Sequence, residues 1–199
     1  LYLWLGISGL ATGITLARQG IDSIIFERDE ALSKNGSGTT ISKNALVLLE
    51  RLGVLDQLQK ESFRTDKIII KSGKNKITEL NPDILYTTRQ KITEILAEHY
   101  FKSGGQILFS HNLVNFNNDK EELLFDNDSK YVVSHVLACD GINSKLREKY
   151  FASNEKAIFS GFNAWRGITK EMKIDSAEMH YGPNAHLVTY PINNTLDRC

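Results

Sequence analysis

Two glycines and one glutamate near the start of the chain have types and a spacing that suit the binding of phosphate and sugar groups. Gly6 and Gly9 follow an apolar run at residues 1–5, and Glu27 closes the next apolar run. A glycine at position 6 lets the backbone approach a phosphate, and a glycine at position 9 lets a helix pack closely on the preceding strand. The N–H groups at the positive end of that helix attract the phosphate. A carboxylate about 20 residues further on stands where ribose hydroxyls are bound.

The elements that must position these residues are a strand, a helix and a second strand. Residues 1–5 suit a strand buried on both faces, and apolar residues at helical spacing from Leu10 to Ala17 suit a helix that ends at Gly20. Residues 22–28 then suit a second buried strand, which completes a right-handed βαβ unit. Trp4 occupies the place of the first glycine in the pattern G-x-G-x-x-G. A turn that serves packing alone is therefore the alternative.

The rest of the chain continues with alternating elements. The patterns predict helices at residues 42–53, 54–59, 88–104 and 144–151. They predict a hairpin at 67–80 and strands at 106–110, 113–116, 122–125 and 131–140, of which the last is the longest. From Phe159 to Tyr190 they again predict β structure. This order predicts a doubly wound α/β domain, followed by a sheet-based second domain that begins near residue 155.

Composition excludes several classes of function. The chain has 199 residues, of which 41% are hydrophobic and 24% charged, as in ordinary globular proteins. Lys and Arg number 24, as do Asp and Glu, so no basic field favours nucleic acid. Residues 1–17 are uncharged, but a membrane span needs about 20 apolar residues, so none is expected. The cysteines, Cys139 and Cys199, give neither a disulfide framework nor a metal cluster, which predicts a cytoplasmic protein without a metal site.

Several ordered motifs together resemble one family, the class A flavin-dependent monooxygenases, close to salicylate hydroxylase and similar aromatic hydroxylases. The opening GISGLATGITLARQGID…IIFER is similar to the family's first FAD-binding segment. The further motifs are SGTTISKNALVLLERLGV at 37–54, with Lys43 where a proline is common, CDGINSKLR at 139–147, which resembles the Asp-Gly motif D-G-x-x-S-x-x-R, GFNAWRGIT at 161–169 and YGPNAHLVTYPI at 181–192.

This resemblance implies a fold and a domain organisation. Residues 1–152 would form a Rossmann-like (GR2-type) FAD-binding domain of the α/β class, with a β-hairpin insertion at about 65–82. Residues 153–199 would form the beginning of a β-sheet substrate domain, which is incomplete because family members run to nearly double this length. The polypeptide as given is therefore expected to be inactive or nearly so by itself.

The resemblance also implies FAD as cofactor, with NADH or NADPH as co-substrate. The residues implied for FAD are Gly6 and Gly9 for the pyrophosphate, Glu27 with Arg28 beside it for the adenosine ribose, Arg89 for the phosphates or the ribityl chain, the backbone of Leu113 for the adenine, and Asp140 and Gly141 for the flavin phosphates and the nicotinamide cofactor. A guanidinium suits phosphate because it offers a rigid fork of donors. The plain alternatives are a solvated arginine at the start of a helix and an aspartate that serves a turn.

His186 and Tyr190 are the implied catalytic pair. Strand alternation puts residues of equal parity on one face, so both side chains can line one pocket. In related hydroxylases this pair lines the substrate site, where a neutral histidine can accept a phenolic proton. The alternative is a surface histidine and a packed tyrosine. Arg166 could hold a carboxylate or support the sheet, and three further histidines are interpreted as structural: His111, His135 and His180.

The function that follows from the resemblance is the hydroxylation of a small aromatic substrate with O2 and NADH or NADPH. The sequence leaves open whether the protein is a homodimer. It also does not specify the aromatic substrate or the choice between NADH and NADPH. Two alternatives remain at this point. One is a Rossmann-type flavoprotein of another class, such as a dehydrogenase or a reductase. The other is a degenerate FAD-binding remnant that acts only as an interaction module.

Overall fold

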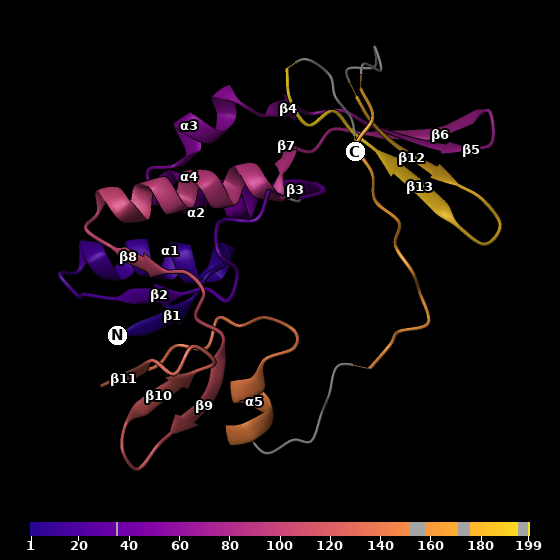
Figure 1. The fold of residues 1–199 in the computed structure, drawn as a ribbon. Helices are drawn as coiled ribbons and strands as arrows, with labels where there is room; N and C mark the ends of the chain where they lie inside the picture. Colours follow the sequence, from indigo (N-terminus) through magenta and orange to yellow (C-terminus); the bar gives the residue numbers. More distant parts are fainter. Residues whose placement is uncertain (35, 152–157, 171–175, 195–198) are drawn as a thin grey trace. The chain divides into compact units, whose positions relative to one another are not determined.

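The computed structural model describes residues 1–34, 36–151, 158–170, 176–194 and 199. The chain forms two compact units, each built from two separate stretches of sequence. Unit 1 comprises Leu1–Ser33 and Leu96–Asn163, and unit 2 comprises Lys34–Ile95 and Ala164–Cys199. Figure 1 shows the ribbon with its elements labelled. The domain boundary expected at residues 152–153 lies outside the described residues.

Unit 1 contains the predicted βαβ unit. Helix α1 (Ile7–Arg18) connects β1 (Tyr2–Trp4) to β2 (Ile24–Phe26), and the two strands pair in parallel. Strand β8 (Gln106–Leu108) joins them in the parallel order β1-β2-β8. On the other side of β1, Tyr2 forms a parallel bridge with Val136. The carboxyl ends of these segments therefore meet at one edge of the sheet.

One tyrosine fixes the packing of helix α4 (Arg89–Lys102) against this sheet. Tyr100 is fully buried, and its hydroxyl donates to the backbone oxygen of Ser23 at 2.5 Å. A Cβ atom at Gly13 would lie 2.6 Å from the ring, and one at Gly105 would lie 2.3 Å from it. The ring thus occupies the space that two glycines leave free.

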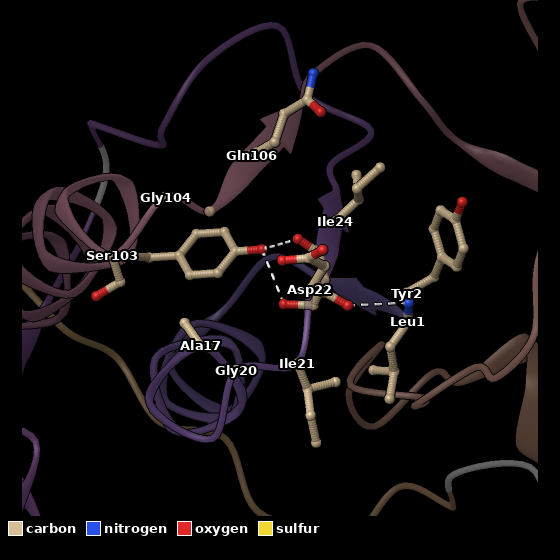
Figure 2. Close-up of a pocket in the computed structure, with 13 residues that line it drawn as sticks. Leu1, Tyr2, Ala17, Gly20, Ile21, Asp22, Ile24, Ser103, Gly104 and Gln106 are labelled. Carbon is tan, nitrogen blue, oxygen red and sulfur yellow. Dashed lines mark hydrogen bonds between the residues drawn. The ribbon is translucent and has the colours of Figure 1, made fainter.

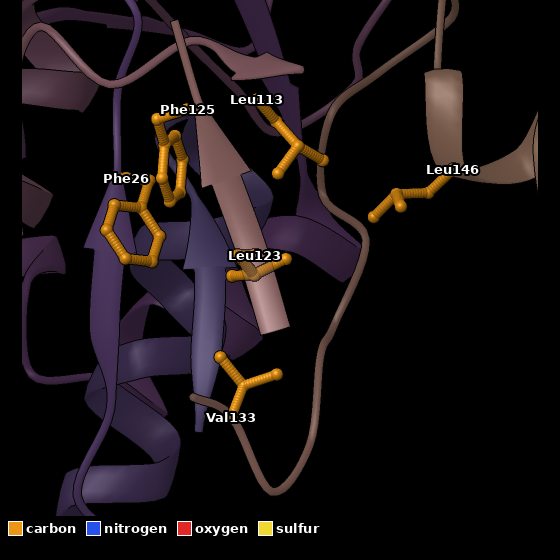
Figure 3. Close-up of a cluster of buried hydrophobic side chains, with 6 residues drawn as sticks. All are labelled: Phe26, Leu113, Leu123, Phe125, Val133 and Leu146. Carbon is orange, nitrogen blue, oxygen red and sulfur yellow. The ribbon is translucent and has the colours of Figure 1, made fainter. Parts of the chain in front are cut away.

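A second sheet in unit 1 packs on the first through the cluster that Figure 3 shows. Strands β9 (Leu113–Asn117), β10 (Glu122–Phe125) and β11 (Lys130–Val132) form an antiparallel meander. Phe26 of β2 packs on Phe125 with ring centroids 4.4 Å apart. Helix α5 (Lys145–Tyr150) adds Leu146, and the buried members are Phe26, Leu113, Leu123, Phe125, Val133 and Leu146.

The prediction of one long strand over residues 131–140 is wrong. Strand β11 ends at Val132, which pairs with Glu122, the first residue of β10. The partner strand therefore runs out at this point. Val132 is 73% exposed, whereas Val133 is 2% exposed and belongs to the buried cluster. The chain bends at the next residue, Ser134. Further along, only Val136 forms a bridge, and its partner belongs to the other sheet.

Unit 2 contains two sheets. The first has the antiparallel order β3-β7-β4, made of β3 (Gly38–Ser42), β7 (Ile84–Thr88) and β4 (Phe63–Thr65). Helices α2 (Lys43–Arg51) and α3 (Leu55–Lys60) lie between β3 and β4 in the chain. One buried cluster of this unit contains Tyr86, Ala177, Tyr190 and Ile192.

The second sheet of unit 2 has the order β13-β12-β5-β6. Strands β5 (Ile68–Ser72) and β6 (Asn75–Leu80) form a hairpin at the position expected from the sequence. Strand β12 (Ala177–Tyr181) pairs with β5 in parallel and with β13 (His186–Thr189) in an antiparallel manner. This sheet therefore combines residues from the two separate stretches of unit 2.

The prediction of β structure from Phe159 onward is wrong for its first part. Residues 158–168 form no strand and are exposed, Thr169 forms a single bridge, and the first strand after it among the described residues is β12 from Ala177. Apolar residues such as Trp165 give this segment the sequence pattern of a strand. In the structure they are exposed, and no described strand pairs with the segment. Within the described part of the chain, no helix has the length and the apolar character to cross a membrane.

Candidate cofactor-binding site

The turn between β1 and α1 has the geometry of an anion-binding turn. Gly6 has φ 156° and ψ 174°, a combination that essentially only glycine adopts. A Cβ atom at Gly6 would meet no atom of the described residues within 4 Å, so the space beside this backbone is open. The first helical hydrogen bond runs from the N–H of Leu10 to the oxygen of Gly6 at 3.0 Å. The N–H groups before Leu10 therefore have no acceptor within the helix.

Gly9 brings α1 into direct contact with the end of β1. A Cβ atom at Gly9 would lie 1.8 Å from the backbone oxygen of Trp4, a distance that no side chain can occupy. The close helix–strand packing expected at this glycine is present. Trp4 stands where a glycine was expected, and its half-buried side chain packs against the cluster of Figure 3. Its ring thus belongs to the core of unit 1.

The Asp-Gly motif lies beside the glycine turn. A Cβ atom at Gly9 would be 3.6 Å from the Cβ of Cys139, the residue before Asp140. Gly141 has φ 79°, in the left-handed region, and its oxygen accepts from the N–H of Ser144. Ser144 then caps α5 by accepting from the N–H of Arg147 at 3.0 Å. The motif is therefore a fixed turn at the same edge of the sheet.

Glu27 follows β2 at this edge and has a half-buried carboxylate. One of its oxygens accepts from the backbone N–H of Asp29 at 3.0 Å. Burial raises the pKa of Glu27, and the negative charge of Asp29 acts in the same direction, whereas the N–H of Asp29 lowers it. The side chain of Arg28 is exposed, with its Nε 3.7 Å from a carboxylate oxygen of Asp29. A ligand hydroxyl that donates to Glu27 would stabilise its charged form.

The backbone of β8 and of the residues that follow it is hydrogen-bonded to the backbone of Glu27. The N–H of Glu27 donates to the oxygen of Leu108 at 2.9 Å, and the N–H of His111 donates to the oxygen of Glu27 at 2.8 Å. Leu113 points its side chain into the buried cluster, and its backbone oxygen accepts from Lys145 Nζ at 3.3 Å. Leu113 follows His111 by two residues, and its backbone contact with an adenine stays a prediction.

Arg89, by contrast, belongs to unit 2. It begins α4, and its N–H donates to the backbone oxygen of Ser37 at 3.1 Å. Thr88 caps this helix, because its hydroxyl oxygen accepts from the N–H of Lys91 at 3.1 Å. Arg166 reaches the same loop, with Nη1 3.5 Å from the hydroxyl of Ser37. Two arginines are therefore held at one loop of unit 2.

His186 and Tyr190 have different surroundings within unit 2. His186 is exposed, and its ring lies 5.9 Å from that of Tyr181. Tyr190 is 9% exposed and packs against Tyr86, with ring centroids 4.7 Å apart and the rings tilted by 31°. Burial, together with neighbouring Cys199, raises the pKa of Tyr190 to about 12, so its phenol is neutral at physiological pH. The two residues share the parity of one sheet face, but one is open to solvent and the other is packed.

A charged cluster in unit 2 was missed by the sequence analysis. The buried carboxylate of Glu178 accepts from Lys71 Nζ at 2.9 Å and lies 2.8 Å from Nε2 of His180. Burial acts to raise the pKa of Glu178, but Lys71 and His180 hold it below its usual value. The i, i+2 spacing of Glu178 and His180 could have indicated their contact, because residues two apart lie on the same face of a strand. Lys71 is 107 residues away in the sequence, which hid the pairing.

A hollow of about 380 Å³ lies at the opposite, amino-terminal edge of the parallel sheet in unit 1 (Figure 2). It is lined by the first residues of β1, β2 and β8 and by the loops at residues 20–23 and 103–105. The predicted cofactor-binding residues do not line it. Among the described residues, no group of His, Cys, Asp and Glu side chains could hold a metal ion.

Comparison with known proteins settles which family has this arrangement. Residues 6–182 match the sequence model of a family described as FAD binding domain. The chain belongs to this FAD-binding family. It is 32% identical over 174 residues to Monooxygenase 1 from Arabidopsis thaliana, covering 83% of this chain and 43% of that protein. It is 24% identical over 209 residues to 3-hydroxybenzoate 6-hydroxylase 1 from Aquipseudomonas alcaligenes, covering 94% of this chain and 52% of that protein.

Solved structures show the same fold. A crystal structure of CtdE in complex with FAD superposes with a TM-score of 0.85 at 19% identity, covering 99% of this chain and 56% of that one. The tetrameric form of 2-methyl-3-hydroxypyridine-5-carboxylic acid oxygenase gives a TM-score of 0.78 at 18% identity. The chain therefore spans about half the length of the curated relatives that it matches.

The residues at the edge of unit 1 fit the FAD that the family implies. The backbone at Gly6 leaves open the space that a side chain would fill, and free N–H groups of α1 follow it. Glu27 is a half-buried carboxylate whose raised pKa a donating ribose hydroxyl would lower. The diphosphate and the adenosine ribose thus have matching partners within one unit.

Proposed function

We propose that this chain is the FAD-binding part of a monooxygenase that hydroxylates a small aromatic compound with O2 and NADH or NADPH. The observation that carries the proposal is the edge of unit 1, where the open backbone at Gly6, the carboxylate of Glu27 and the Asp140–Gly141 turn follow neighbouring parallel segments. Relatives named as a monooxygenase and a hydroxybenzoate hydroxylase support the reaction class.

In this proposal the chain binds, orients and shields, and FAD supplies the redox chemistry with O2 and the nicotinamide when it is bound. Gly6, Gly9 and the N-terminus of α1 hold the pyrophosphate, and Glu27 accepts from the adenosine ribose. Asp140 and Gly141 contact the flavin phosphates. The remaining assignments are Arg28 beside the ribose, Arg89 at the phosphates or ribityl chain and Leu113 at the adenine.

His186 and Tyr190 are proposed to act on the aromatic substrate. The exposed imidazole of His186 is accessible to accept a phenolic proton, which makes the ring more nucleophilic. The neutral phenol of Tyr190 can orient the substrate as a hydrogen-bond donor, because a pKa of about 12 keeps its proton in place. Its packing on Tyr86 holds the ring in one position.

Binding of FAD to the chain tests the first part of the proposal. Isothermal titration should show one FAD site, whereas a folded chain with no FAD affinity would favour a degenerate remnant that acts as an interaction module. Because the chain spans about half of its relatives, it should not oxidise NADH or NADPH at a significant rate by itself.

The full-length parent tests the reaction. Its oxidation of NADH or NADPH should be stimulated by one member of a panel of hydroxybenzoates, with a hydroxylated product. Oxidation that no aromatic compound stimulates would favour a reductase. In the parent, H186A should abolish product formation and retain FAD, and a full rate in that variant would remove His186 from the catalytic pair.

We further place the protein in the cytoplasm, because Cys139 and Cys199 are both free and belong to different units. We take a homodimer, which the sequence leaves open, as the assembly to test for the parent. Light scattering of the purified parent tests this expectation, and a strictly monomeric mass would contradict it.

A further inference from the structure

His111 is held at both nitrogens next to the candidate site in unit 1. Its Nδ1 lies 2.6 Å from the backbone oxygen of Phe109, and its Nε2 lies 3.3 Å from the hydroxyl of Tyr131. Because a carbonyl only accepts, Nδ1 carries the proton, and Nε2 accepts from the tyrosine. The ring packs among Phe26, Phe125 and Tyr131, with centroid distances of 5.5, 5.1 and 5.7 Å.

The hydrogen bond from His111 to Phe109 closes a strained turn. Ser110 lies between them with φ 57°, in the left-handed region that non-glycine residues adopt only at an energetic cost. The side chain of Asn127 supports the same turn, since its Nδ2 donates to the oxygen of Ser110 at 2.9 Å. Two side chains therefore hold a backbone conformation that the local sequence disfavours.

This turn fixes the backbone on both sides of the Glu27 side chain. The N–H of His111 donates to the oxygen of Glu27 at 2.8 Å, and the N–H of Ser110 donates to the oxygen of Asp29 at 3.0 Å. Asp29 in turn donates its own N–H to the Glu27 carboxylate at 3.0 Å. The orientation of that carboxylate thus depends on the turn that His111 closes.

We propose that His111 is a positioning residue for the cofactor: its ring locks the turn at Ser110, and the turn aims the Glu27 carboxylate at the adenosine ribose. This inference rests on the proposed binding of FAD at the edge of unit 1. His111 itself touches no ligand in this proposal. Its effect must therefore pass through Glu27, which gives the proposal a sharp test.

The test is a double-mutant cycle on FAD affinity, measured by isothermal titration with the full chain. His111→Phe keeps an aromatic ring in the cluster and removes both ring hydrogen bonds. It should raise the Kd for FAD about five- to tenfold, as expected for the loss of an aligned hydrogen bond. In a Glu27→Gln background the same change should alter the Kd by less than about twofold, because the carboxylate that His111 positions is gone.

Further variants separate positioning from folding. His111→Asn retains an N–H donor close to Nδ1 and should recover most of the affinity. Asn127→Ala weakens the same turn from an exposed position, so it decides the question if His111→Phe does not fold. It should show the same dependence on Glu27. The matched control is His135→Gln, whose exposed side chain lies outside this network and should leave the Kd unchanged.

Equal losses of FAD affinity with and without the Glu27 carboxylate would overturn the positioning role, because they would show a general effect on structure. An unchanged Kd in folded His111→Phe would overturn it as well. If the unmodified chain binds no FAD, the proposed function fails first, and the role of His111 fails with it.

Discussion

Unit 1 and unit 2 each contain a glutamate withdrawn from solvent, and the two carboxylates have opposite properties. At the edge of unit 1, burial raises the pKa of Glu27, and its described partner is a backbone N–H. In the sheet of unit 2, Lys71 and His180 lower the pKa of Glu178. A half-buried carboxylate held by backbone N–H groups can still accept from a ligand, whereas one held by the side chains of a lysine and a histidine stabilises the fold. The two pKa values shift in opposite directions because burial outweighs the backbone donors at Glu27, whereas Lys71 and His180 outweigh burial at Glu178.

The largest expected effect comes from Gly9→Val, which disrupts the packing of α1 on the end of β1 at the unit 1 site. A Cβ atom there would overlap the backbone oxygen of Trp4, at 1.8 Å. We expect a loss of more than about 3 kcal/mol in the free energy of unfolding, together with the loss of FAD binding. Circular dichroism during urea unfolding measures the first effect and isothermal titration the second.

The control is Gly167→Ala, where a Cβ atom meets no described atom within 4 Å. It should leave both quantities unchanged. A Gly9→Val protein that still binds FAD with normal affinity would show that the turn is not the phosphate site.

The next effect concerns the unit 2 carboxylate. Glu178→Gln leaves the partly buried ammonium of Lys71 without its counter-charge and should cost about 2 kcal/mol of unfolding free energy at pH 7. Because the pKa of Glu178 is lowered in the folded state, its contribution to stability is present above the usual glutamate pKa of 4.5 and is lost as the pH falls through the folded pKa. The difference between the two proteins should therefore shrink in acid.

Glu27→Gln should have the reverse pattern. Because the pKa of Glu27 is raised in the folded state, its contribution to stability is present below the usual glutamate pKa of 4.5 and is lost as the pH rises through the folded pKa. The variant should thus be at least as stable as the unmodified chain at pH 7, yet its Kd for FAD should rise about tenfold. Urea unfolding and isothermal titration give both values, and a less stable variant with normal affinity would reverse the comparison.

The smallest effect at neutral pH is expected at the tyrosine pair of unit 2. Burial raises the pKa of Tyr86 and of Tyr190 to about 12. Since an unfolded tyrosine titrates near 10, the pair should stabilise the fold fully below pH 10 and progressively less as the pH rises toward 12. Tyr190→Phe should have little effect at pH 7 and should reduce this alkaline loss, as unfolding at several pH values would show. An identical alkaline profile in both proteins would contradict the assignment.

Local patterns were sufficient to predict the βαβ unit that positions the candidate site in unit 1. The βαβ unit follows from an apolar strand, a helical period and glycines at fixed positions, and each of these signals lies within a few residues. The close contact at Gly9 was predictable because a helix can approach a strand end only where no side chain intervenes. Trp4 departed from the expected pattern, yet the fold accommodates its ring in the core.

Long-range pairings were not predictable. The segment at residues 131–140 has the composition of a strand, but its partner β10 ends before it does. The turn at Ser110 depends on His111 and Asn127, and no local rule assigns φ 57° to a serine. The contact of Lys71 with Glu178 became evident only from the parallel pairing of β5 with β12.

That parallel pairing delays the completion of the unit 2 sheet while the chain is being synthesised on the ribosome. The partners Lys71 and Glu178 are 107 residues apart, and between them the chain passes through residues 96–163 of unit 1. At translation rates of about 5–20 residues per second, the free edge of β5 therefore waits about 5–20 s for β12 to emerge. During that interval a row of isoleucines is available to other nascent chains. Holdase chaperones are expected to cover it until β12 leaves the exit tunnel.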